Sequence, residues 1–158
     1  MATIPNLTND AGLPANLDAE KTILGAILLD NAAHSEAAEK LEADDFSLDS
    51  HRRIFLRMSE LMDMERAVDI VTLANELARN KEVESVGGVA YLASLTEGLP
   101  RRPVIEDYIR IVKDKSLLRK LMGICSMAIA RAADQSESAL EVLGAATNSV
   151  PSWPKARW

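Results

Sequence analysis

The residue types that most often bind metals are scarce in this chain. Its two histidines, His34 and His51, do not lie three or four residues from a second ligand residue in a recognised metal-binding pattern. His51 directly precedes Arg52 and Arg53, whose positive charges disfavour a bound cation. We therefore predict that the chain has no metal site.

Residues for acid–base or phosphate chemistry are equally scarce. Asp44 and Asp45 are neighbours in a predicted turn and would not converge on one atom, so we interpret them as a solvated loop. None of the seven glycines is followed by lysine, which excludes a P-loop, and Gly87-Gly88 is interpreted as a plain turn. The sequence predicts no catalytic residue and no cofactor.

One basic cluster, made of His51, Arg52, Arg53 and Arg57, lies on a single predicted helix. It is either a solvated face or a site for a partner, and the solvated face is the better supported of the two. The net charge of the chain is −6. Because nucleic-acid binding relies on Lys and Arg side chains that displace counterions, we expect little direct contact with DNA or RNA.

Composition indicates a helical globular protein. The 158 residues are 47% hydrophobic and 27% charged, and aromatic residues make up only 4%. No apolar run approaches the 18 or more residues of a membrane span, and the N-terminus does not combine a basic stretch with an apolar one. We expect a cytoplasmic protein without membrane contact.

Apolar residues at helical spacing, with helix caps between them, predict an all-α fold. Predicted caps are Asn16, Asp69, Ser138 with Glu141, and either Asp49 or Ser50. Phe46 is a predicted core residue, and Gly25 indicates close approach of another helix. The expected organisation is a flexible arm over 1–15, a compact multi-helix head over 16–100, a protruding antiparallel helical hairpin over 101–150, and an unstructured tail over 151–158.

The hairpin begins with a long helix, with Pro103 in its first turn, that carries more apolar surface than one partner helix needs. Apolar residues recur at alternating steps of four and three from Val104 to Ala132, interrupted by Lys115, and a second apolar set lies on an adjacent face. Cys125, the one cysteine, is predicted to be a small buried residue of this seam. These residues are either core of a helical domain or a surface for a second chain, and the length of the helix favours self-association.

Six blocks of sequence, in this order, resemble the N-terminal domain of the DnaB-type replicative DNA helicase. They are Glu20 to Asp30, Asp44-Asp45-Phe46, His51 to Phe55, Val68 to Leu73, Gly87-Gly88 with Tyr91-Leu92, and Tyr108 to Arg119. No single block is specific, but all six are in register over residues 16–150. The resemblance implies a helical head with a helical hairpin.

In that family the hairpins pair, and the dimers assemble into a three-fold collar on a hexameric ring that engages primase and, in some bacteria, a loader. The resemblance thus implies dimers or hexamers, with primase and a loader as partners. The implied self-association residues are Tyr108, Ile111, Leu118, Met122, Cys125 and Ile129. The family's motor, which uses ATP and Mg, has a P-loop that this chain does not contain, so the chain by itself is not expected to be an enzyme.

Two other hypotheses remain. A free-standing adaptor or inhibitor could act on another helicase's collar, with the Trp-containing end from Pro151 to Trp158 as a docking peptide. An unrelated enzyme on a helical scaffold would need a bound metal or cofactor. The block series favours the collar domain over both.

Overall fold

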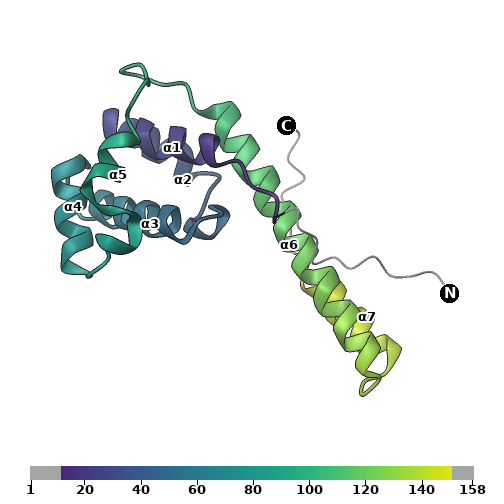
Figure 1. Cartoon of the computed structure of the whole chain (residues 1–158). Helices are drawn as coiled ribbons and strands as arrows, with labels where there is room; N and C mark the ends of the chain where they lie inside the picture. The colour runs from purple at the N-terminus through teal and green to yellow at the C-terminus, as the bar shows by residue number, and fades with distance from the viewer. Residues whose placement is uncertain (1–11, 151–158) are drawn as a thin grey trace. The chain divides into compact units, whose positions relative to one another are not determined.

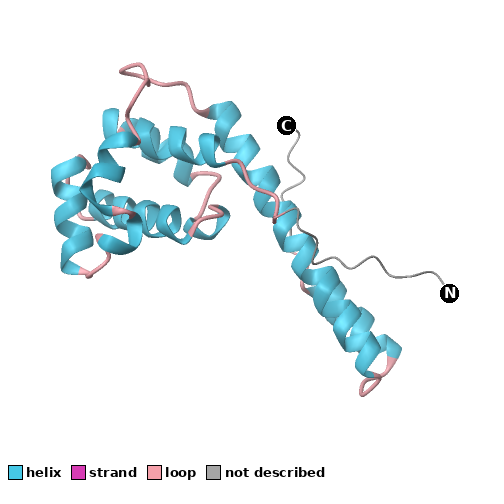
Figure 2. Cartoon of the chain, viewed as in Figure 1, coloured by secondary structure: helices cyan, strands magenta, loops and turns pink. Residues whose placement is uncertain are grey.

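Regular secondary structure in the described part of the chain, residues 12–150, is entirely helical in this computed structural model (Figure 2). The prediction of an all-α fold is confirmed. In chain order the elements are α1 (Leu17–Leu29), α2 (Ala32–Ala38), the 3-10 turn η1 (Ala43–Asp45), α3 (Asp49–Asp63), α4 (Ile70–Arg79), the 3-10 turn η2 (Glu84–Val86), α5 (Gly88–Ser94), α6 (Glu106–Asp134) and α7 (Ala139–Asn148). Residues 1–11 of the arm predicted over 1–15, and the whole tail predicted over 151–158, lie outside the described residues.

Side-chain caps fix the starts of three helices where the sequence predicts them. The side chains of Asn16, Asp69 and Ser138 each accept a hydrogen bond from the backbone N–H three residues later, at the starts of α1, α4 and α7. Such caps satisfy backbone donors that have no partner within the helix. The prediction that Asp49 or Ser50 caps α3 is wrong, because α3 already includes both residues.

The described chain forms two compact units. The head unit is Ala15–Ser116, and the hairpin unit contains residues 117–150 together with 12–14. The division falls inside α6, whereas the apolar pattern of the sequence places the boundary at residue 101. Long α6 therefore belongs to both units (Figure 1).

A single apolar core fills the head unit. Its buried side chains come from every helix of the head, and α3 alone contributes Ile54, Phe55, Met58 and Leu61. Phe46 is fully buried as predicted, and its ring centroid lies 4.9 Å from that of Phe55. The core positions the polar side chains described below.

Gly25 on α1 permits the close approach of α5. A Cβ at this position would lie 2.0 Å from the carbonyl oxygen of Leu95, the residue that ends α5, and 2.7 Å from Cδ1 of Leu99. Neither backbone could yield enough to accept a methyl group. The close contact predicted from the glycine is confirmed.

The helices of the hairpin unit are the second half of α6 and α7, which runs back along it (Figure 1). An ion pair between Arg131 and Glu137 spans the connecting turn, where Gln135 adopts a left-handed conformation with φ of 56°. Since α6 begins at Glu106, the prediction that Pro103 lies in its first turn is wrong. Within residues 12–150, no helix has the length and apolar character that crossing a membrane requires.

Candidate interaction surface

Large apolar side chains are exposed along the hairpin unit. Leu140 is 81% exposed and Leu143 60% on α7, and Leu118 and Leu121 are 40% and 44% exposed on α6. The last buried residue of α6 is Ser116, and among residues 117–150 none is buried. Within residues 117–150, α6 and α7 are the two helices available to cover each other, and apolar faces of both stay exposed.

A shallow apolar groove of about 510 Å³ lies between α6 and α7 near the connecting turn. Its lining is Ala128, Ile129, Ala132, Gln135, Glu137, Ala139, Val142, Leu143 and Ala146. Alanines from both helices line this groove together with the larger Ile129 and Leu143. The groove extends the exposed apolar surface to the tip of the hairpin.

The six predicted self-association residues all lie on α6 but are divided between the two units. Tyr108 and Ile111 belong to the head unit, where Ile111 packs against the core and Tyr108 is exposed. The other four, Leu118, Met122, Cys125 and Ile129, belong to the hairpin unit.

Cys125 is exposed, so the prediction that it is a buried residue is wrong. Leu118 and Ile129 are about two-fifths exposed, and Met122 is half-buried. The physical reason is that, within residues 117–150, α7 is the one helix available to cover α6. The seam therefore exists as a helical face, and whether a second chain covers it stays a prediction.

The predicted basic cluster does not exist as a surface, because its histidine is buried. Nδ1 of His51 lies 2.5 Å from Oε2 of Glu20, and its Nε2 lies 2.7 Å from the hydroxyl oxygen of Tyr91. The backbone N–H of Ser47 donates to the other oxygen of Glu20. Burial raises the pKa of Glu20, but the hydrogen bonds from His51 and Ser47 outweigh it and leave this pKa below its ordinary value.

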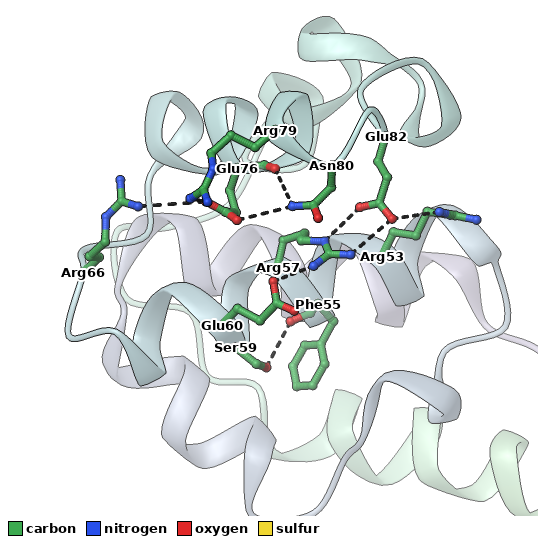
Figure 3. A network of polar contacts seen from close by, with 10 residues as sticks. All are labelled: Arg53, Phe55, Arg57, Ser59, Glu60, Arg66, Glu76, Arg79, Asn80 and Glu82. Atoms are coloured by element: carbon green, nitrogen blue, oxygen red, sulfur yellow. Dashed lines mark hydrogen bonds and ion pairs between the residues drawn. The ribbon is translucent and has the colours of Figure 1, made fainter.

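The arginines of the cluster form hydrogen bonds to other parts of the head. Arg53 and Arg57 both donate to the carboxylate of Glu82, and Arg57 donates to Glu60 as well (Figure 3). Arg52 donates to the backbone carbonyl of Phe46. The hydrogen bond from Arg57, aided by Arg53, lowers the pKa of Glu82 despite its burial. Arg57 is mostly covered by these contacts, whereas Arg53 is 37% exposed, so a partner site at Arg53 stays a prediction.

Asp45 is buried, so its interpretation as part of a solvated loop is wrong, whereas Asp44 beside it is exposed. The carboxylate of Asp45 accepts hydrogen bonds from the hydroxyl of Ser116 at 2.6 Å and from Nζ of Lys113 at 2.9 Å. It also accepts from the backbone N–H of Glu42. The one carboxylate therefore joins α6 to the start of η1.

Each buried carboxylate named above is paired within the head, and within residues 12–150 no three His, Cys, Asp or Glu side chains gather where a metal ion could bind. These contacts do not account for the exposed apolar surface of the hairpin unit.

Residues 12–114 match the family model described as the DnaB-like helicase N-terminal domain. The chain is 38% identical over 144 residues to the replicative DNA helicase DnaB of Treponema pallidum, covering 91% of this chain and 33% of that protein. It is 42% identical over 117 residues to the replicative DNA helicase DnaC of Bacillus subtilis, covering 74% of this chain and 26% of that protein. The chain spans about a third or less of the length of these relatives.

Solved structures agree. The N-terminal domain of DnaB helicase from Mycobacterium tuberculosis superposes with a TM-score of 0.83 at 28% identity, covering 88% of this chain and 98% of that one. A DnaB-like replicative helicase, studied with its interactions with primase, shares the fold with a TM-score of 0.68 at 21% identity, covering 85% of this chain and 31% of that one. The chain belongs to the family of DnaB-like helicase N-terminal domains.

Proposed function

We propose that this chain is the collar domain of a replicative DNA helicase, which associates with copies of itself through the hairpin unit and provides a docking surface for primase. The observation that carries the proposal is the burial pattern of the hairpin. From Leu117 to Val150 no described residue is buried, although Leu118, Leu121 and Leu140 are large and apolar. A second hairpin would remove these side chains from water.

The energetic argument rests on apolar area. Removing apolar surface from water contributes about 25 cal/mol per Å². An exposed apolar surface that continues over two helices and a groove is typical of a site for another protein. Two such hairpins present the same surface to each other, which fits a symmetric dimer. We also propose that three such dimers assemble into a hexamer, and this step is supported by family membership alone.

Self-association is tested by charged substitutions at two leucines of equal exposure. Leu118 on the hairpin is 40% exposed and Leu56 on α3 of the head is 42% exposed. Leu118→Asp should shift the sedimentation profile of the full chain to monomer, because an unpaired charge in an apolar interface costs several kcal/mol. Leu56→Asp should leave the profile as in the wild type. Equal behaviour of the two variants would place the interface elsewhere.

Docking of primase is supported by the family and by the relative that was studied with primase. The test is binding of the full chain to the primase encoded in the same genome, measured by surface plasmon resonance. Saturable binding is expected. Failure to bind at concentrations where the chain is assembled would remove the docking role and leave self-association standing. A helicase loader is a second proposed partner, tested in the same way.

The proposed role needs no catalytic residue, metal or nucleotide within this chain. We assign ATP, Mg and DNA unwinding to the motor of such helicases, and only slight nucleic-acid contact to this acidic chain of net charge −6. Isothermal titration of the chain with ATP and Mg should give no binding heat. Stoichiometric nucleotide binding would contradict this assignment.

A further inference from the structure

The first half of α6 packs on the rest of the head unit through a short set of contacts. Ile109 and Val112 join the apolar core, and Ser116 is the last buried residue of the helix. With Ile105, which precedes the helix, these are three of the 22 buried hydrophobic residues of the core. The other 19 lie between Ala19 and Leu95. Most of the core is therefore complete without α6.

Two polar side chains on this half of α6 converge on one carboxylate. Lys113 and Ser116 both donate to Asp45, which lies about 70 residues earlier in the chain and is 1% exposed. The Ser116 hydroxyl is itself buried, and a buried hydroxyl requires a partner. Asp45 also accepts from the N–H of Glu42, so its own position on η1 is fixed.

We propose that Asp45 acts as a latch: its hydrogen bonds to Lys113 and Ser116 hold the first half of α6 against the rest of the head. When these hydrogen bonds break, this half of α6 can detach while the rest of the head stays folded. The latch is placed at the end of the buried part of α6, because the compact head unit ends at Ser116. Neutralising Asp45 weakens its charge-assisted hydrogen bonds. These hydrogen bonds offset the free-energy cost of burying the Ser116 hydroxyl and the Asp45 carboxylate. The local apolar contacts that remain are few, and helices depend on tertiary packing for most of their stability.

Hydrogen–deuterium exchange of the full chain tests the latch. In Asp45→Asn, amides of residues 110–116 should exchange about ten- to a hundredfold faster, as expected for loss of hydrogen bonds to a charged group. Amides of α3 should change much less. Asp44→Asn is the matched control, because it removes the same charge from the neighbouring, exposed residue, and it should leave both segments unchanged.

Ser116→Ala is a milder second variant, which should speed exchange in the same segment by a smaller factor. In the double variant with Asp45→Asn the two factors should not multiply, because both changes remove one shared hydrogen bond. Unchanged exchange of residues 110–116 in Asp45→Asn would overturn the proposal. Equal loss of protection in α3 in either variant, or factors that multiply, would overturn it as well.

Discussion

Nδ1 of His51 lies 2.5 Å from Oε2 of Glu20, and both side chains are buried. With Tyr91 on the far side of the imidazole, this contact joins α1, α3 and α5 by hydrogen bonds through the core. Removing one partner of such a buried contact is costly, because the other polar group is left without a hydrogen bond in an apolar setting.

Glu20→Gln should destabilise the head by about 2 to 3 kcal/mol, because His51 and the Ser47 amide would lose hydrogen bonds to a charged carboxylate. Glu106→Gln is the matched control: Glu106 pairs with Arg110, and both side chains are about half exposed. The control should cost less than about 1 kcal/mol. Urea unfolding followed by circular dichroism measures both, and equal costs would mean that the buried pair contributes no more than an exposed one.

The cost of Glu20→Gln should depend on pH. The folded-state pKa of Glu20 lies below its ordinary value of 4.5, so the unfolded chain binds this proton more readily than the folded one. Its contribution to stability is therefore fully present above pH 4.5 and is lost as the pH falls through the lowered folded-state pKa. The difference in unfolding free energy between wild type and variant should shrink on acidification below that point. A difference that stays constant or grows would show that ionised Glu20 is not the source of the stability.

Glycine-to-alanine substitutions should have opposite effects in α1 and α6. Gly25→Ala should destabilise the chain by about 1 to 3 kcal/mol, because the new methyl group would overlap the Leu95 carbonyl. Gly123→Ala, with nothing within 4 Å of the new atom, should stabilise by about 0.5 to 1 kcal/mol through lower backbone entropy of the unfolded state. Thermal unfolding of both variants measures this, and a neutral Gly25→Ala would refute the close approach of α5.

Structural features that depend on residues close in sequence, such as helix caps and helix positions, were predictable from the sequence. Caps at Asn16, Asp69 and Ser138 act between residues three apart, so the sequence contains all of the partners. Apolar spacing identified the helices for the same reason. Phe46 and Gly25 were also predictable, since a large aromatic side chain in a polar turn usually anchors a core and a glycine in an apolar stripe usually lies where another backbone comes close.

Polar residues with distant partners were not predictable in the same way. Asp45 finds Lys113 and Ser116 about 70 residues away, and nothing near it in sequence distinguishes it from exposed Asp44. A signal did exist for the buried pair: Glu20 and His51 each occupy the first position of an i, i+3, i+4, i+7 apolar stripe. An acid and a histidine on core-facing stripes indicate a buried pair better than a surface cluster.

For the hairpin, the sequence predicts the apolar face but not what covers it. Helical spacing identifies the face that carries Leu118, Met122 and Ile129. The spacing does not tell how many other helices cover this face, or whether they belong to the same chain. A buried Cys125 would require the seam to be covered within one chain. Within residues 117–150 α7 is the one helix available to cover it, and Cys125 is exposed.

Self-association through the hairpin unit is tested most directly by the light-scattering mass of the full wild-type chain across a concentration series. We predict a mass of two chains, or a rise from two to six, against 17.2 kDa for a single chain. A mass of one chain at every concentration would contradict the proposal, because the exposed leucines of α6 and α7 would then remain in water without a second copy to cover them.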